Sequence, residues 1–361
     1  MRKREYVPVI VLALTCALLW FVPPPQRLVD DSAETSSAKV VEVDDSRIEV
    51  IGTLEYGTQC LTVELPDGSR RQAENELRAQ LELDKKFKVG DRALVVLGDE
   101  PLVARDHYRI GWMAALFLVF AAALVAFGGW VGAKSLFSFV FSCMVVWKLV
   151  VPLTLKGFSA SWISFFAVSV LSAVIMYLVA GASRRGLAAF LGAMLGMASS
   201  LVLAVFFSAM MHVDGATMPY AQALVNSGCE SLDLSDLFIG AIILASSGAV
   251  MDLAMDISAG MHEVKFHNPG IARAKLFMSG VRIGRAVVGT MTTTLLLAYS
   301  GGYLTMLMVF AVQGTSPLDF LNTTLVSAEV VKTLVGSFGL VLVAPFTALV
   351  GAWIFTFRRK G

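Results

Sequence analysis

Charged residues are scarce in this chain. Asp, Glu, Lys and Arg together make up 16% of its 361 residues, while 56% of the residues are hydrophobic. An average soluble domain is about 25% charged, so the composition predicts a membrane protein. The formal net charge is +1, and neither sign is in the excess that would indicate a nucleic-acid partner.

The usual signatures of cofactor and metal sites are also missing. The four cysteines include no C-x-x-C pair, which argues against a thiolate metal site, and no glycine-rich phosphate loop follows a predicted strand. His262 and His267 are five residues apart, whereas the zinc-protease motif needs four. His212 and Asp214 alone are weak evidence for a metal. We therefore expect a protein that is not an enzyme and has no cofactor, and we leave a metal site unassigned.

An apolar run near the N-terminus follows a basic cluster. Residues 7–22 are preceded by Arg2, Lys3 and Arg4, a pattern typical of a signal anchor or an uncleaved signal sequence with a cytoplasmic N-terminus. On either interpretation the next segment is delivered outside. We take residues 1–22 as an N-terminal signal-anchor helix.

Residues 23–109 differ abruptly from the rest because they carry much of the charge. The stretches 60–71 and 89–99 alternate apolar with polar residues and contain Pro-Asp-Gly and Val-Gly-Asp turns, which is the pattern of short half-buried strands. We expect a small extracytoplasmic β-rich domain, an OB-like barrel or a sandwich. The sequence ENELRAQLEL (74–83) could add one or two helical turns to it.

From residue 110 onward, apolar stretches long enough to cross a bilayer recur, each needing roughly 17–25 residues as a helix. Together with the N-terminal run they predict a polytopic α-helical membrane protein with about eight transmembrane helices, and 110–361 is its multi-helix transmembrane domain. The predicted spans in this domain are 110–128, 131–152, 159–180, 187–211, 236–258, 283–300 and 337–357.

The charges of the loops orient these spans. Ser183–Gly186 and Glu263–Arg285 are rich in Lys and Arg, whereas His212–Asp236 has neither. The positive-inside rule places the first two segments, and both chain ends, in the cytoplasm, and the third segment outside. Cys60 and Cys229 then lie on the outer side, where they could form a disulfide.

Residues 301–335 do not fit a simple crossing. The run 301–312 is too short for an upright span, and the segment after it carries Asp319, Glu329 and Lys332. A full crossing here would also put the basic C-terminus outside. We therefore predict a hairpin or re-entrant segment, followed by an amphipathic helix at the surface or in the bundle.

Two carboxylates lie inside the predicted span 236–258. Asp252 and Asp256 are four residues apart, so they share one helix face. A charged residue at bilayer depth costs at least about 2.5–3.5 kcal/mol, so one that is retained usually faces the bundle interior or a water-filled cavity. Two such carboxylates cannot both ionise cheaply, which suits a proton or cation relay. Asp256 is near the cytoplasmic end and could instead simply be solvated.

The next span begins with Arg282 and Arg285. Arg285 lies one turn below Gly289 on a face that continues to Thr293, and Thr290 adds a further hydroxyl. Small and hydroxyl-bearing side chains let helices approach closely and can interact with a neighbouring helix or an ion. Plain anchoring by the arginines and tight packing by the threonines are the competing interpretations.

Three stretches carry a family resemblance: SGAVMDLAMDISAGMHE (247–263), SGVRIGRAVVGTMTTTLLLAYSGG (279–302) and LNTTLVSAEVVKTLVGSFGLVLVAPFTA (321–348). Through them the chain resembles the YibE/F family of bacterial integral membrane proteins over most of its length. The resemblance implies a multi-pass protein of the bacterial plasma membrane, with an extracytoplasmic β-domain after the first helix. It implies a transporter more than an enzyme, and it identifies no substrate.

The positions that match the family's blocks are Gly248, Met251, Asp252, Gly280, Ile283, Gly284, Arg285, Gly289, Thr290, Met291, Asn322, Glu329, Gly336, Gly339, Pro345 and Thr347. Three positions depart from the pattern. The family often has Asp where Ala286 stands and Asn where Thr293 stands, and Asp256 replaces a residue that is more commonly small or neutral. The departures indicate that an acid has moved from one helix to its neighbour.

Two functions follow as hypotheses. An ion- or proton-coupled transporter would bring Asp252 and Arg285 together with Glu329 or Asn322 around a polar cavity, and a broken helix near 301–314 would suit such a site. A non-transporting scaffold or accessory protein would use its outer β-domain to bind an envelope partner. Besides the lipid bilayer, the sequence identifies neither the small molecule or ion nor an oligomeric state. The candidate pathway residues are Asp252, Asp256, Arg285, Thr290, Thr293, Asn322 and Glu329.

Overall fold

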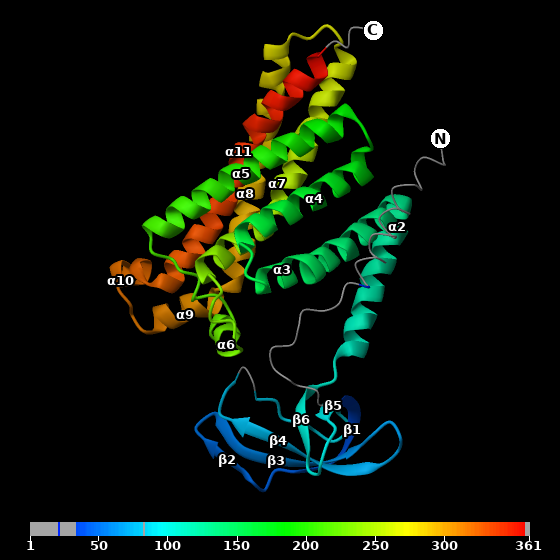
Figure 1. Cartoon of the computed structure of the whole chain (residues 1–361), viewed down its shortest axis with the longest axis vertical. Helices are drawn as coiled ribbons and strands as arrows, with labels where there is room; N and C mark the ends of the chain where they lie inside the picture. The colour runs from blue at the N-terminus through cyan, green and yellow to red at the C-terminus, as the bar shows by residue number, and fades with distance from the viewer. Residues whose placement is uncertain (1–20, 22–33, 82–83, 358–361) are drawn as a thin grey trace. The chain divides into compact units, whose positions relative to one another are not determined.

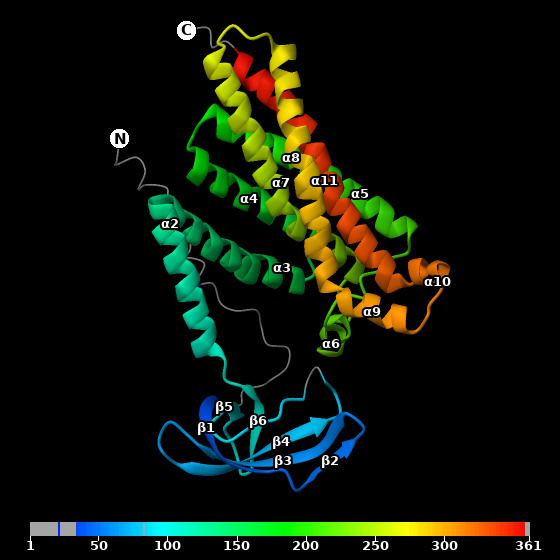
Figure 2. The same ribbon diagram turned by 180° about the vertical axis from the view of Figure 1, so that it is seen from behind.

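The computed structural model describes Phe21, residues 34–81 and residues 84–357. The chain from Val29 to Phe127 forms one compact unit, and the chain from Gly128 onward belongs to a second (Figures 1 and 2). Apart from Phe21, the predicted signal-anchor helix of residues 1–22 lies outside the described residues. Cys60, Cys143 and Cys229 are free thiols.

The first unit contains a closed β-barrel. β1 pairs with both β3 and β5, β3 with β4, β4 with β6 and β6 with β5, so five strands form a ring to which β2 adds a hairpin. The β4–β6 pair is parallel and the other pairs are antiparallel. This is the connectivity of an OB-like barrel, one of the two folds predicted. The strands are β1 (Thr35–Asp44), β2 (Ile48–Ile51), β3 (Leu54–Glu64), β4 (Arg70–Arg78), β5 (Arg92–Val96) and β6 (Leu102–His107).

The barrel interior includes a buried polar pair beside its apolar side chains. Val40, Leu61 and Val63 are fully buried, and so is Gln59. The Gln59 amide donates to the Phe87 carbonyl at 3.0 Å, and its Oε1 accepts from Phe87 N–H at 2.9 Å and from the Asn75 amide at 3.1 Å. These bonds satisfy polar groups that would otherwise be costly to bury.

The helical turn predicted in ENELRAQLEL is wrong for its first half. Residues 74–78 belong to β4, whose alternation buries Ala73, Asn75 and Leu77 and turns the residues between them outward. In a strand, apolar residues are expected at every second position on the buried face. Asn75 occupies such a position but is polar, so the alternation is not evident in the sequence. Its partner Gln59 explains why it is tolerated there.

The second unit is a bundle of long apolar helices. Within the described residues, five helices are long and apolar enough to cross a membrane, or six if the bent pair α8 and α9 counts as one span. The chain is therefore a multi-pass helical membrane protein with an N-terminal β-barrel, and the number eight stays a prediction. From residue 110 the helices are α2 (Ile110–Val145), the π-helical η1 (Val146–Val150), α3 (Val151–Leu155), α4 (Ala160–Ala180), α5 (Arg184–Met210), α6 (Ala221–Asn226), α7 (Leu234–His267), α8 (Arg273–Gly302), α9 (Leu304–Val312), α10 (Pro317–Asn322) and α11 (Thr324–Thr356).

Two breaks interrupt the long helices. Gly129 in α2 has φ 53° and ψ −128°, a conformation that glycine tolerates, and it separates 110–128 from the following helix where the sequence predicts a break. Between α8 and α9 the chain bends by 64°. After this bend, α9 and α10 contact each other through Phe310 and Phe320, whose ring centroids are 5.2 Å apart.

The amphipathic helix predicted after this segment is not a separate element. α11 runs unbroken for 33 residues, so Glu329 and Lys332 belong to the same helix as the predicted last span, 337–357. The two side chains pair with each other at 3.1 Å. This pairing lets one helix carry both charges at its start and an apolar segment beyond them.

Contacts between small residues hold α11 against α5. A Cβ added to Gly192 of α5 would lie 2.7 Å from the Thr347 Cα of α11, and one added to Gly196 would lie 2.9 Å from the Val343 Cβ. Gly339 of α11 lies opposite Ser200 of α5. Small residues allow such close backbone approach, which is how helices associate within a bilayer.

The bundle has two ends of different charge. Ser258 Oγ donates to the Arg185 carbonyl at 2.7 Å, and Arg184 Nη1 donates to the Phe357 carbonyl at 3.2 Å. The starts of α5 and α8 therefore meet the ends of α7 and α11 at one end, which we call the basic end: Arg184, Arg185, Lys265, Arg273 and Lys275. The opposite end, which we call the acidic end, carries Asp214, Glu230, Asp233 and Asp236. The two segments predicted to share a side of the membrane thus share one end of the bundle.

The packing of α5 on α11 predicts that Gly192→Val lowers the free energy of unfolding by about 1–3 kcal/mol, because the added methyls meet backbone atoms of α11. The measurement is unfolding in detergent and SDS mixtures of the purified full-length protein. Gly301→Val is the matched control, since a Cβ there meets nothing within 4 Å. Equal stability of the two variants would contradict the packing.

Candidate functional site

Asp252 and Asp256 lie on an outward face of α7, near the middle of this 34-residue helix. Both side chains are exposed, as are Ala241, Ala245 and Gly248 along the same face. A Cβ added to Gly248 would meet nothing within 4 Å. The two carboxylates therefore share one face, as their spacing predicts, and the rest of that face is made of small side chains.

The expectation that Asp252 faces the bundle interior is wrong. The inward face of α7 is filled by other residues, among which Val250, Leu253 and Ile257 are fully buried against neighbouring helices. Ser258 on this face bonds the Arg185 carbonyl of α5. With that face occupied by packed side chains, the carboxylates turn to the opposite side.

Arg285 does not meet the aspartates. It is exposed on α8, next to Gly284, which packs against Ala344 of α11 and Ile257 of α7. Within residues 84–357 no ion pair or hydrogen bond joins Arg285 to Asp252 or Asp256. Arg285 and Asp252 therefore make no direct contact, and their convergence around a shared polar cavity stays a prediction.

The predicted threonines bond within their own helix. Thr290 Oγ1 donates to the Val287 carbonyl at 2.9 Å, and Thr293 Oγ1 donates to the Gly289 carbonyl at 3.3 Å. Both are exposed on α8. Such bonds occupy the hydroxyl protons and leave oxygen lone pairs available to a ligand.

Glu329 and Asn322 also lie apart from Asp252. Glu329 pairs with Lys332 at 3.1 Å, and the Asn322 amide donates to the Leu318 carbonyl of its own helix at 2.8 Å. Gly336 of α11, less than two turns from Glu329, lies opposite Ser246 of α7. Since Ser246 is almost two turns before Asp252, the pair Glu329–Lys332 lies toward the acidic end, away from the aspartates.

Glu329 and Lys332 belong to a polar cluster that was not predicted from the sequence. The Lys332 ammonium lies 5.9 Å from the centre of the Tyr299 ring, a cation–π distance. The Tyr299 hydroxyl is placed where a Cβ on Gly336 would come within 3.3 Å of it. Thr333 Oγ1 is buried here on α11 without a hydrogen-bond partner. The signal in the sequence was the pair of opposite charges three residues apart.

Lys148 is a second residue that the sequence analysis overlooked. It lies in the π-helical turn Val146–Val150 and is partly buried. π-turns within α-helices are frequent at functional sites. The signal was present in the sequence, because a lysine inside the apolar run 131–152 is unusual.

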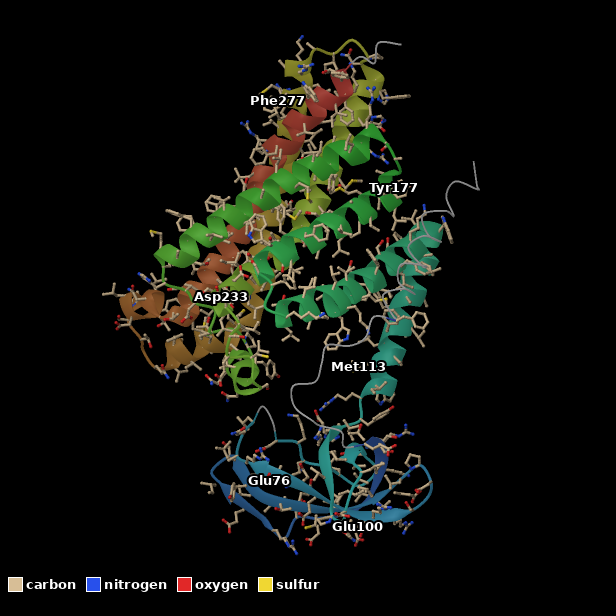
Figure 3. The ribbon with its side chains drawn as sticks, viewed as in Figure 1. Glu76, Glu100, Met113, Tyr177, Asp233 and Phe277 are labelled. Atoms are coloured by element: carbon tan, nitrogen blue, oxygen red, sulfur yellow. The ribbon has the colours of Figure 1, made fainter. Side chains whose placement is uncertain are left out.

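A hollow opens at the acidic end of the bundle. It has a volume of about 370 Å³ and is lined by polar residues from the starts of α4 and α7, including Ser159, Asp233 and Asp236; Figure 3 labels Asp233. Asp236 accepts from Ser161 N–H at 3.3 Å, and Asp233 caps α7 by accepting from Ser235 N–H at 2.9 Å. Among the residues that the structure describes, no group of three or more His, Cys, Asp or Glu could hold a metal ion.

Comparison with known proteins gives one match. A family model described as YibE/F-like protein matches residues 116–357, which is more than half of the chain. No curated protein and no solved structure matches. The matched region holds every candidate residue described above.

The partly buried pair predicts that Lys332→Ala lowers stability by about 1–3 kcal/mol, because it leaves the Glu329 carboxylate without its partner. The double variant Glu329→Ala/Lys332→Ala should lose less than the sum of the two single variants. Unfolding of the purified full-length protein in detergent measures both effects. Additive losses would show that the pair is not coupled.

Proposed function

Since the chain belongs to the YibE/F-like protein family, we propose that it is a transport protein of the bacterial plasma membrane, coupled to a proton or cation that Asp252 accepts. The observation that carries the proposal is the pair of carboxylates near the middle of a membrane-spanning helix, with no basic partner among the described residues. Intramembrane ionisable groups mark ion and substrate pathways by default. The proposal includes no enzymatic reaction.

The contrast with Glu329 supports a transport role over a structural one. Where this bundle uses a carboxylate structurally, it provides a lysine at 3.1 Å and an aromatic ring beside it. Asp252 has neither, and small residues surround it on its face. A structural carboxylate would need compensation at this depth, whereas a carboxylate that binds and releases a cation must remain available.

Asp256 lies one turn from Asp252 on the same face of α7, toward the basic end. Two carboxylates in register can pass a proton or a small cation between them, because each is within one helical turn of the other. Thr290, Thr293 and Arg285 of α8 supply further polar groups on the neighbouring helix. In this scheme Arg285 acts on an anionic substrate and does not neutralise Asp252.

The proposed topology follows from the charge of the two ends. We place the basic end in the cytoplasm and the acidic end outside, together with residues 23–109, in a chain that crosses about eight times. The hollow at Asp233 and Asp236 then faces the outer compartment. Acidic groups at such a mouth raise the local concentration of cations.

The test is ion flux in liposomes that contain the purified full-length protein and a trapped pH-sensitive dye. A membrane potential is imposed, and Na⁺, K⁺, Mg²⁺ and phosphate are supplied in turn. Wild type should move protons with at least one of these ions. Asp252→Asn, which cannot bind a proton or hold a negative charge, should fall to the level of protein-free liposomes.

Glu263→Gln is the matched control, because Glu263 is an exposed acid at the end of the same helix. It should keep wild-type flux. Asp252→Asn must also elute and unfold like wild type, so that lost flux is not lost folding. Wild-type flux in a folded Asp252→Asn protein would refute the assignment.

A second candidate, a non-transporting scaffold or accessory protein, is favoured by a hollow in the first unit. Next to the barrel strands a pocket of about 690 Å³ is lined by residues that include Arg92, His107 and Trp112. The hydrogen bond from Arg109, 2.8 Å long, holds the pKa of Asp106 below its usual value. Such a pocket could bind an envelope component. In that case Asp252→Asn would keep the protein's activity in cells, whereas Trp112→Ala would lose it.

A further inference from the structure

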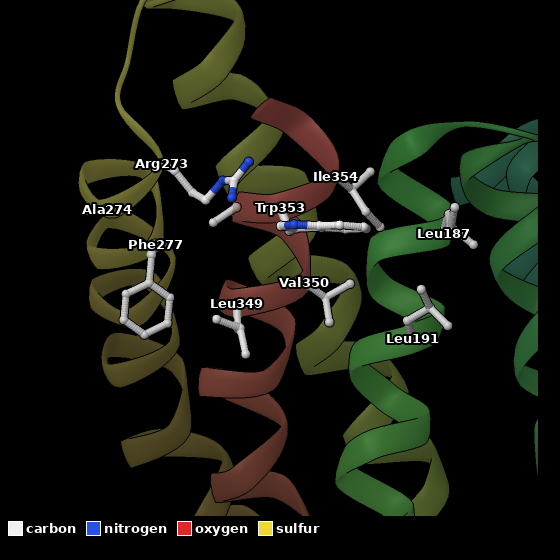
Figure 4. A pocket seen from close by; sticks show the side chains of 10 residues that line it. Leu187, Leu191, Arg273, Ala274, Phe277, Leu349, Val350, Trp353 and Ile354 are labelled. Atoms are coloured by element: carbon white, nitrogen blue, oxygen red, sulfur yellow. The ribbon is translucent and has the colours of Figure 1, made fainter. Parts of the chain in front are cut away.

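A groove runs along the surface of the bundle at its basic end. α11 forms its floor, and α8 and α5 form its two walls (Figure 4). Its volume is about 830 Å³. The residues that line it are Leu187, Leu191, Arg273, Ala274, Phe277, Leu349, Val350, Ala352, Trp353 and Ile354.

All but one of these residues are apolar. The side chains of Leu191, Phe277 and Leu349 come from three different helices, and Leu349 is 60% exposed. The groove lies on the surface of α5 and α11, which are each apolar and long enough to span a membrane, and of α8, which is so together with α9. An apolar lining at this position is therefore suited to contact with lipid acyl chains.

The exception, Arg273, stands at the mouth of the groove. Its Nε donates to Thr356 Oγ1 at 3.0 Å, while Arg184 Nη1 donates to the carbonyl of the next residue, Phe357, at 3.2 Å. Two guanidinium groups from different helices thus bond the C-terminal end of α11, and of the two Arg273 lines the groove. Each has five N–H donors, so most of them remain free for an anion.

Trp353 gives the groove an interfacial marker. Its indole lies across the floor beside Arg273 and is 57% exposed. Tryptophan is enriched at the level of lipid headgroups, where the apolar ring and the polar N–H both find suitable surroundings. The end of the groove at Arg273 and Trp353 therefore suits a lipid headgroup, and the rest of the groove suits an acyl chain.

We propose that this groove binds one anionic phospholipid. The phosphate bonds Arg273 at the mouth of the groove, and an acyl chain lies along Trp353, Leu349 and Phe277. Charge selects an anionic lipid over a zwitterionic one, because the basic end has only one exposed acid on α7, Glu263, against a cluster of Lys and Arg. Basic pockets between membrane helices on the cytoplasmic side bind anionic headgroups in this way. The proposal does not depend on whether the protein transports.

The experiment is native mass spectrometry of the detergent-purified full-length protein, titrated with phosphatidylglycerol or with phosphatidylcholine of the same acyl chains. Wild type should bind one phosphatidylglycerol about fivefold or more tightly than phosphatidylcholine. Arg273→Gln should remove this preference. Arg282→Gln, an exposed arginine on the same helix but outside the groove, should keep it.

A second variant tests the apolar end without touching the arginines. Ala274→Trp fills the groove from α8 and should weaken binding of both lipids. Glycerol phosphate, which has the anion but no acyl chain, should not displace phosphatidylglycerol. The proposal is overturned if wild type shows no headgroup preference, if Arg273→Gln keeps it, if Ala274→Trp binds as wild type, or if glycerol phosphate competes.

Discussion

The close contact between α5 and α11 is the constraint on which the rest of the bundle depends. In a bilayer the tails are as apolar as the side chains, so helices associate only where backbones approach closely or polar groups bond. Gly192, Gly196 and Gly339 permit that approach, and Ala188, Ala193 and Ala348 around them are fully buried. α7 and α8 then pack on α11 through Val250, Gly280 and Gly284. Removing α11 would leave α5 and α8 without their main packing partner.

This packing determines where polar groups can be. A hydroxyl is accommodated inside the bundle when it bonds a backbone carbonyl, as Ser246 does with Ile242 at 2.9 Å. Charges inside the bundle need a partner, and Glu329 has Lys332. Asp252 and Asp256 have no described basic partner, and they lie on the one face of α7 that the neighbouring helices leave open. An outward face at mid-helix is thus the place where this bundle retains unpaired acids.

Much of the architecture could be predicted from the sequence, because its signals are local. The alternation in 60–71 predicts strands, and apolar length predicts the spans. The orientation of α7 was predicted wrongly, because a carboxylate within an apolar span is expected to face the bundle interior. The larger apolar side chains Val250, Leu253 and Ile257 instead occupy the packed face. Asn75 misled in the opposite sense, since an inward polar residue interrupts the pattern of a strand. The charges of Glu329 and Lys332 likewise suggested a separate amphipathic helix, whereas their pairing lets one helix continue through both.

The π-turn at Val146–Val150 has a consequence for the helix that carries Lys148. Such a turn accommodates one residue more than an α-helical turn, so the side chains before and after it are out of phase by about 100°. The direction of the Lys148 side chain is therefore set by this backbone irregularity and does not follow from regular α-helical spacing. If the turn migrated along the helix, Lys148 would swing about the axis while both ends of the helix stayed where they are. A lysine mounted this way can exchange one set of surroundings for another without any helix being displaced.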